Sequence, residues 1–265
     1  MESLGHIQRK SMLYRTKVEY GDWAMNHVQG CFHGCNYPCY AFLMAKRFGR
    51  AETYEKWRRP FLVDNTLQLL RKELPRYKGE IKRVQLCFTT DPFMEGYPEI
   101  REMSLKAIEL INSFGIPCEI LTKGVLPIQL VRLPKAELNA YGITLVSLDE
   151  RYREHMEPGA ASCVRRLASL TALHDKGLKT WVSMEPYPTP NICNQSLTFI
   201  LEKIDFVDRI VFGRTHYDKC TNEYADVDGF YYRAAETVID FCNKRDIACH
   251  IKKGTLAQVQ ASAES

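Results

Sequence analysis

The chain has 265 residues, 45% of them hydrophobic, which is enough to bury one substantial core in a single domain. Its 36 basic residues are nearly balanced by 32 acidic ones, so the formal charge of +4 neither requires nor excludes a nucleic-acid partner. The first residues lack the apolar stretch of a signal peptide, and no segment has the roughly 20 apolar residues of a membrane span. We therefore expect a soluble, cytoplasmic protein with no membrane partner.

Strand-like and helix-like segments alternate along the chain. β-rich runs predict strands at 24–28, 81–88, 117–122, 141–148, 178–184, 208–213 and 247–253. Helical periodicity predicts helices between several of them, at 63–74, 99–115, 160–177 and 229–246. Strands joined by helices of this length imply parallel crossovers. The sequence therefore predicts an α/β fold, a partial (β/α)6 TIM-like barrel with parallel strands, and an open doubly wound sheet is the second choice.

The predicted organisation is an N-terminal extension at 1–20, the barrel at 21–254 and a polar tail at 255–265. Polar segments follow six of the predicted strands: GCFHGCNYPCYA, TTDPF, TKG, SLDERYREHMEPG, EPYPTP and GRTHYD. Each segment alone is compatible with an ordinary turn. Because the loops after parallel strands gather on one rim, we expect these segments to form a shared site.

Three of the ten cysteines, Cys31, Cys35 and Cys39, lie within nine residues of one another. In a helix, the first and third would be about 12 Å apart along the axis, and Gly34 and Pro38 would break such a helix. The segment is therefore predicted to be a loop that curls around an inorganic centre. Other cysteines are isolated and are interpreted as buried structural thiols: Cys118, Cys163, Cys193, Cys242 and Cys249.

The residues alone leave three interpretations of this loop open. A structural zinc ion would need a fourth ligand, for which His33 is the nearest candidate. The thiols could also carry no metal. An iron–sulfur cubane held by three protein thiolates, instead of the usual four, would keep one iron free to bind another molecule.

The order of short motifs resembles the radical S-adenosylmethionine (SAM) superfamily, and within it the spore photoproduct lyase-like branch. That branch has an N-x-x-x-GC-x-HGC-x-YCYA loop, followed at later strand ends by TDP, TKS, a serine, and EPGA with a following arginine. The chain has NHVQGCFHGCNYPCYA, TTDPF, TKG, VSLDE and MEPGAASCVRR in the same order, across about residues 20–190. It departs from the branch at Pro38, which widens C-x3-C-x2-C to C-x3-C-x3-C, and at Gly124, where the branch usually has serine.

The resemblance implies a [4Fe–4S] cluster bound by Cys31, Cys35 and Cys39, with SAM chelated by the open iron. A reduced cluster would cleave SAM to a 5′-deoxyadenosyl radical that abstracts a hydrogen atom from substrate, in a site that excludes water. An electron donor such as flavodoxin or ferredoxin would supply the electron. The reaction would be of the lyase or oxidoreductase type.

The resemblance also implies residues that hold SAM. Thr90 and Asp91 would contact its amino group, Lys123 its carboxylate and Ser147 its ribose. Tyr37 would lie near the adenine, although Pro38 displaces it from the family position. The ordinary alternative for Asp91 is a helix cap or an Asx-turn, and the ordinary alternative for Lys123 is a charge exposed to solvent.

Two further acidic residues lie in the polar loops. Glu157 could form an ion pair with Arg165 or Arg166 that braces the SAM pocket, or the arginines could lie on the wet face of a helix that starts nearby. Glu185 ends the fifth helix-flanked strand and is expected to face the same cavity, within reach of SAM or substrate.

Two cysteines are candidates for catalysis. In the lyase branch, a cysteine near the TDP strand end returns a hydrogen atom to the product radical. Cys87 lies near that place, four residues before Asp91, and a buried strand thiol is its ordinary interpretation. Cys220 lies in a polar loop that we expect to set substrate specificity, together with His216, Tyr217, Tyr224, Tyr231 and Tyr232; these aromatic residues could equally be edge packing.

The substrate stays open at this level. Nucleic acid or a nucleotide is possible, but the basic excess is slight and no DNA-binding module is recognisable. A peptide, nucleoside or small metabolite is equally compatible with the fold. The alternative from another class is a non-catalytic, zinc-stabilised binding protein that uses the loop Cys31, His33, Cys35 and Cys39.

Overall fold

The computed structural model describes residues 4–17, 19 and 21–256. Most of the predicted extension is therefore described, whereas all but Thr255 and Leu256 of the predicted tail lies outside the described residues. Within the described part of the chain, no helix combines the length and the apolar character needed to cross a membrane.

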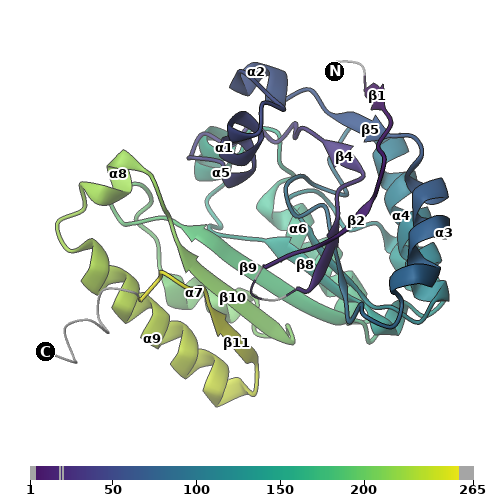
Figure 1. Ribbon diagram of the computed structural model, residues 1–265. Coiled ribbons are helices and arrows are strands. Elements are labelled where there is room, and N and C mark those ends of the chain that lie inside the picture. Colours follow the sequence, from purple (N-terminus) through teal and green to yellow (C-terminus); the bar gives the residue numbers. More distant parts are fainter. Residues whose placement is uncertain (1–3, 18, 20, 257–265) are drawn as a thin grey trace, which may run out of the picture.

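One large sheet forms the centre of the molecule (Figure 1). Its strands are β2 (Leu13–Arg15), β3 (Trp23–Met25), β6 (Val84–Leu86), β7 (Cys118–Thr122), β8 (Ala140–Thr144), β9 (Lys179–Tyr187), β10 (Arg209–Arg214) and β11 (Ala248–Ile251). They lie in the order β11-β10-β9-β8-β7-β6-β3-β2. All neighbours are parallel except β2 and β3. In the described chain, β2 and β11 do not pair, so the predicted partial barrel of parallel strands is confirmed and no closed barrel forms.

Helices connect the parallel strands and cover the sheet: α3 (Thr66–Tyr77), α4 (Pro98–Ser113), α6 (Cys163–His174), α7 (Leu197–Lys203) and α9 (Val227–Arg245). In Figure 1, α3 and α4 lie side by side near one end of the sheet, and α9 lies along β11 near the other. In α4, Ile100, Ala107, Ile108 and Ile111 are buried, which is the spacing of a helix with one apolar face. These helices confirm the periodicity found in the sequence.

Shorter elements lie mainly in the connecting loops: α1 (Tyr40–Arg47), α2 (Tyr54–Trp57), α5 (Glu150–Met156), α8 (Lys219–Asn222), and the 3₁₀ turns η1 (Ile128–Arg132) and η2 (Ala136–Leu138). The sequence patterns did not predict α1, which begins directly after the third cysteine of the loop. Helix α1 also forms one wall of a groove on the surface of the molecule.

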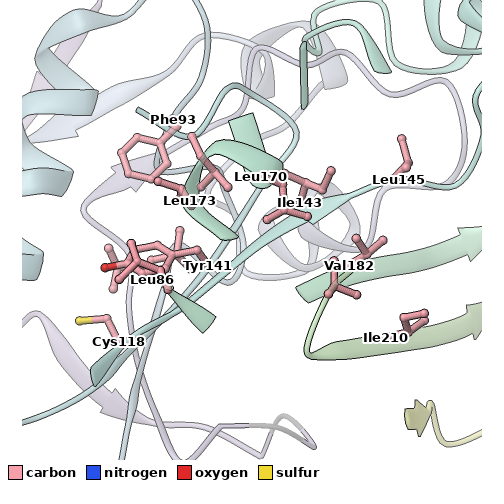
Figure 2. Packing of buried hydrophobic residues seen from close by; sticks show 14 of the residues in the cluster. Leu86, Phe93, Cys118, Tyr141, Ile143, Leu145, Leu170, Leu173, Val182 and Ile210 are labelled. Carbon is pink, nitrogen blue, oxygen red and sulfur yellow. The ribbon is translucent and has the colours of Figure 1, made fainter. Parts of the chain in front are cut away.

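The core lies between the sheet and its helices (Figure 2). Ile143 of β8 and Val182 of β9 are fully buried and belong to the same cluster as Leu170 and Leu173 of α6. Burial of each such side chain contributes about 1.5–3 kcal/mol to folding. This packing fixes the strand ends from which the polar loops emerge.

The strand predicted at 24–28 is in fact two short strands, so that prediction is corrected. β3 ends at Met25, whereas β4 (Val28–Gln29) pairs with β5 (Phe61–Val63) in a second sheet that also contains β1 (Gly5–Ile7). The two residues between them, Asn26 and His27, are buried, and their side chains form hydrogen bonds with the loop after β6 and with α4. Those bonds end the β3 strand and redirect the chain toward the cysteine loop.

Candidate active site

The three clustered cysteines lie in a loop, as predicted, between β4 and α1. Gly30 and Gly34 have φ values of +85° and +65°, the left-handed region that glycine adopts without a steric penalty. Cys39 is the N-cap residue of α1, so the third thiol lies where the helix begins. The thiols thus do not share a helical face.

Several parts of the fold hold the backbone of this loop. The Cys31 amide donates to the Trp57 carbonyl at 2.9 Å, and the Tyr54 hydroxyl donates to the Cys35 carbonyl at 2.6 Å. On the other side, the Gly159 amide donates to the His33 carbonyl at 2.8 Å. The loop is therefore preorganised by the segments before and after it.

All three thiols line one cavity of about 180 Å³, which we call the thiol cavity. Burial raises the pKa of Cys31 well above its ordinary value and that of Cys35 to about 11, so both are neutral thiols in the absence of a metal. The donor set fits a cubane, because each of the three thiolates would bind a different iron. Among the described residues, no group of three His, Cys, Asp or Glu side chains is arranged to bind a single metal ion.

His33, the candidate fourth ligand of a zinc ion, uses both ring nitrogens within the protein. Its Nε2 lies 2.8 Å from Asp91 Oδ2, and its Nδ1 lies 3.2 Å from the Gly159 carbonyl oxygen. Nitrogens that already form hydrogen bonds would have to give them up to bind a metal. The ring instead joins the cysteine loop to the loop after β6.

The carboxylate of Asp91 is buried, lines the thiol cavity and accepts four hydrogen bonds. Besides His33, its donors are the Phe93 amide at 2.7 Å, the Thr122 hydroxyl at 2.6 Å and the Lys123 amide at 2.7 Å. Burial opposes ionisation, but His33 and these hydrogen bonds together lower the pKa of Asp91. The residue is thus a charged junction between three loops, and its Asx-type bond to Phe93 is one part of that junction.

Lys123, Glu157 and Arg166 form a buried ion network beside the thiols. Lys123 Nζ lies 2.6 Å from Glu157 Oε1, and Arg166 lies 2.8 Å from Glu157 Oε2. Although burial acts against the charge, the two cations lower the pKa of Glu157 to about 2. Of the two candidate arginines, Arg166 is therefore the partner of Glu157, whereas Arg165 is exposed and pairs with Glu95.

Tyr37 joins this network through its hydroxyl group. The hydroxyl donates to Glu157 Oε1 at 3.1 Å and is also hydrogen-bonded to Lys123 Nζ, which lies 4.7 Å from the centroid of the tyrosine ring. Tyr37 lines both the thiol cavity and a second, larger cavity of about 570 Å³, which we call the outer cavity. The ring therefore lies at the junction of the two cavities despite the additional residue Pro38.

The outer cavity lies at the ends of β7 to β11, where the sequence placed the active-site rim. Glu185 lines it and forms an ion pair with Lys252 at 3.6 Å. His216 and Tyr217 line it from the loop after β10, as the sequence suggested for a specificity region. Tyr231, in contrast, is fully buried and donates to the Tyr187 carbonyl at 2.7 Å, which is a packing role.

Some of the predicted site residues line the cavities, and others lie outside them. Thr90 and Cys87 line the thiol cavity with the three clustered cysteines. Ser147 is buried, accepts a hydrogen bond from the Asp149 amide and does not line either cavity. Cys220 is exposed on α8 and likewise lies outside both linings.

Cys87 has an unusual environment for a thiol that follows a strand. Its φ is +50°, which is uncommon for a residue with a side chain. Its sulfur lies 3.4 Å from His27 Nδ1, and His27 Nε2 lies 2.7 Å from the Ser104 hydroxyl. Burial raises the pKa of Cys87 to about 12, and burial with the nearby Arg9 charge lowers that of His27 to about 3. The pair is therefore a neutral thiol beside a neutral imidazole.

Sequence reasoning did not assign roles to His27 or to Gly159. A Cβ added at Gly159 would lie 2.5 Å from the Phe32 carbonyl oxygen, so only glycine allows the cysteine loop to approach this closely. Gly159 is the glycine of the EPGA motif, so the sequence did contain a signal for it. His27 directly follows the asparagine of the motif NHVQGC. The signal available for His27 was a polar residue inside a run that was predicted to be a strand.

Comparisons with known proteins agree with this geometry. A family profile described as the radical SAM superfamily matches residues 25–195. Uncharacterized protein ORF301 of Acidianus two-tailed virus is 29% identical over 219 residues, covering 77% of this chain and 70% of that protein. Uncharacterized protein MJ0683 of Methanocaldococcus jannaschii is 26% identical over 181 residues, covering 68% of this chain and 66% of that protein.

Solved structures show the same fold. Spore photoproduct lyase complexed with dinucleoside spore photoproduct has a TM-score of 0.69 at 16% identity, covering 94% of this chain and 81% of that chain. SuiB of Streptococcus suis bound to S-adenosylmethionine has a TM-score of 0.55 at 15% identity, covering 86% of this chain and 46% of that chain. At these identities the similarity concerns the fold and not the substrate.

Proposed function

The chain belongs to the radical SAM superfamily, and from this premise we propose that Cys31, Cys35 and Cys39 bind its [4Fe–4S] cluster and that SAM lies where the thiol cavity meets the outer cavity. The observation that carries the proposal is that all three thiols line one cavity, which shares lining residues such as Tyr37, Cys39 and Lys123 with a larger one. When bound, the cluster and SAM supply reductive SAM cleavage and a radical that abstracts hydrogen from a substrate. The protein supplies binding, orientation and exclusion of water.

We assign Lys123 to the SAM carboxylate. Its ammonium group is a buried cation that lines both cavities, and Glu157 holds it in a fixed position. A single carboxylate shared by Lys123 and Arg166 leaves a net positive charge in the network, which a second carboxylate would balance. Tyr37 then lies at the same junction and forms part of the wall of the SAM site.

The SAM amino group is assigned to Thr90, which lines the thiol cavity. Asp91 already accepts four hydrogen bonds from the protein, so we assign it the positioning of His33 and the Lys123 backbone more than direct contact with SAM. For the ribose hydroxyls, Glu185 in the outer cavity is better placed than Ser147, which lies outside its lining.

The substrate is proposed to enter the outer cavity, where His216, Tyr217 and Arg214 form part of the wall. Of the two candidate thiols, Cys87 is the one that lines a cavity, and we retain it as the candidate hydrogen-atom donor. Transfer from its S–H to a substrate radical would leave a sulfur radical. The electron donor and a solvent proton would return that radical to the thiol.

The test is cleavage of SAM by anaerobically purified, iron-reconstituted protein in the presence of dithionite. Chromatography should detect 5′-deoxyadenosine with the wild-type protein and none with Cys39→Ser. Metal analysis of the same samples separates the rival function: a zinc-stabilised binding protein would contain about one zinc per chain, no iron, and would leave SAM intact. That result would overturn the proposed enzyme.

A further inference from the structure

A groove of about 640 Å³ lies beside the thiol cavity and adjoins the site described above. Residues 9–17, which include β2, form one wall, and α1 with the turn that follows it forms another. Phe88, Thr89 and Thr90 line both this groove and the thiol cavity. The groove therefore leads to the reaction centre from the side of the N-terminal segment.

The groove is lined by cations without acidic residues. Five basic residues lie along it, and none of its described lining residues is acidic: Arg9, Lys10, Arg15, Lys17 and Arg50. This is unusual for a chain whose charges are nearly balanced. Arg15 pairs with Glu80, but no carboxylate within the described chain forms an ion pair with Arg9 or Arg50. Two arginines with no anionic partner are suited to a phosphate.

Arg9 is held in place before any ligand arrives. Its amide donates to Asn65 Oδ1 at 3.1 Å, its carbonyl accepts from Asn65 Nδ2 at 2.8 Å, and its guanidinium donates to the Asn26 carbonyl at 2.8 Å. Burial and the nearby charge of Arg50 lower the pKa of Arg9, so the two guanidinium groups repel each other. A bound anion would relieve this repulsion without a large loss of side-chain entropy.

Exposed aromatic rings lie along the same groove. Tyr14, Tyr40 and Phe48 line it and are 38%, 54% and 62% exposed. The Arg50 guanidinium lies 5.9 Å from the centroid of the Phe48 ring. Exposed rings that alternate with cations are the pattern of proteins that bind single strands, in which bases stack on the rings and phosphates meet the cations.

We propose that this groove binds a single-stranded nucleic acid, with a phosphate between Arg9 and Arg50 and bases stacked on Phe48 and Tyr40, and leads it toward the thiol cavity. A groove with rings in its walls suits a narrow, flexible strand, whereas a folded acidic electron carrier needs a broad contact surface. The proposal that the groove binds the strand depends on these contacts alone. The proposal that the strand is delivered to the radical also depends on the proposed function.

The test is fluorescence anisotropy of the anaerobic holoprotein with a labelled oligothymidylate of about 12 nucleotides at several salt concentrations. Phe48→Ala should weaken binding by about 5-fold or more, because one stacked base is lost. Arg50→Ala should weaken binding and reduce the slope of log K against log salt by about 0.7, the value for one phosphate contact on a single strand. The matched control, Arg71→Ala on the exposed face of α3, should leave both quantities unchanged.

The inference is overturned if the wild-type protein does not bind the oligonucleotide. It is equally overturned if the Phe48→Ala and Arg50→Ala proteins bind the oligonucleotide as tightly as the wild-type protein does. It is also overturned if Arg50→Ala slows reduction by flavodoxin while the oligonucleotide affinity stays the same, because the surface would then serve the electron donor. Dithionite-driven SAM cleavage by the wild-type protein without oligonucleotide tests the proposed function separately. Groove-dependent binding without SAM cleavage would support this inference and contradict that function.

Discussion

The ammonium of Lys123 lies 2.6 Å from the carboxylate of Glu157, and both side chains are largely withdrawn from solvent. The same carboxylate binds Arg166, so one anion holds two cations, of which Lys123 lines the thiol cavity. Because Lys123 of the TKG motif directly follows β7 and Glu157 of the EPGA motif directly follows α5, this contact joins two loops whose residues are 34 positions apart. It places a fixed positive charge where a cofactor carboxylate is proposed to bind.

The first prediction concerns this ion network. Glu157→Gln removes the charge that balances two buried cations, so the free energy of unfolding should fall by about 3–5 kcal/mol. Urea unfolding of the anaerobic protein measures this change. The control is Glu154→Gln, in which an exposed carboxylate loses its ion pair with Arg153, and it should cost less than about 1 kcal/mol. Equal losses in the free energy of unfolding would mean that the buried ion network stabilises the fold no more than the Glu154 pair does.

The second prediction concerns Gly124, where the lyase-like branch usually has serine. A Cβ added at this glycine would overlap the Phe93 carbonyl oxygen, which belongs to the loop that contains Asp91. Restoring the family residue by Gly124→Ser should therefore lower both stability and iron retention, since the loops would have to separate. Iron analysis and the thermal midpoint measure the effect. The control Gly79→Ser lies in open space, and a Gly124→Ser protein indistinguishable from it would refute this explanation.

The third prediction is a pH dependence of stability caused by His27. Its pKa is lowered to about 3 in the folded protein, whereas an unfolded histidine has a pKa near 6.5. The unfolded state therefore binds more protons between these values, and stability is lost as pH falls through this window. From pH 7.5 to 5 the loss should be about 2 kcal/mol.

Denaturant unfolding of wild type and His27→Gln at pH 7.5, 6.5 and 5 tests this assignment. The variant should be less stable at pH 7.5, because the hydrogen bonds to Cys87 and Ser104 change, and it should have a shallower dependence below pH 6.5. Parallel pH profiles of the two proteins would show that another group causes the acid sensitivity.

The fourth prediction separates the cluster ligands from the other thiols. Cys31→Ser, Cys35→Ser and Cys39→Ser should each lose most of the reconstituted iron, because the cluster would retain only two thiolates. Cys249, which the sequence pattern predicted to be buried, is an exposed thiol on β11, and Cys249→Ser should retain the wild-type iron content. If Cys39→Ser retains its iron, the wider spacing caused by Pro38 has excluded Cys39 from the ligand set.

Much of this architecture was predictable from the sequence because it depends on local patterns. Alternating strand and helix periodicity indicated the parallel sheet, and polar motifs at successive strand ends indicated one rim. The choice between Arg165 and Arg166 was not predictable, because adjacent helical residues point about 100° apart and only packing decides which one is buried. The surroundings of Ser147 were likewise not predictable: β8 ends at Thr144, and the Ser147 hydroxyl accepts a hydrogen bond from the Asp149 amide outside the lining of both cavities.

The groove was not predicted because its parts are distant in the sequence. Arg9 lies before the first strand of the large sheet and Arg50 follows α1, a helix that the sequence patterns did not indicate. Net charge over the whole chain is nearly balanced and hides a local surface of one sign. The pairings of β1 with β5 and of β2 with β3, together with the contacts of Asn65, bring this N-terminal segment beside the reaction centre.

Electron paramagnetic resonance of the dithionite-reduced protein, recorded before and after addition of SAM, tests the central claim most directly. Three thiolate ligands leave one iron open, so we predict the signal of a reduced [4Fe–4S] cluster whose g values shift when SAM binds to that iron. Cys39→Ser should lack the signal, and Lys123→Met should require more SAM to shift it. A protein with no cluster signal, or with a cluster whose spectrum is unchanged by saturating SAM, would contradict the account.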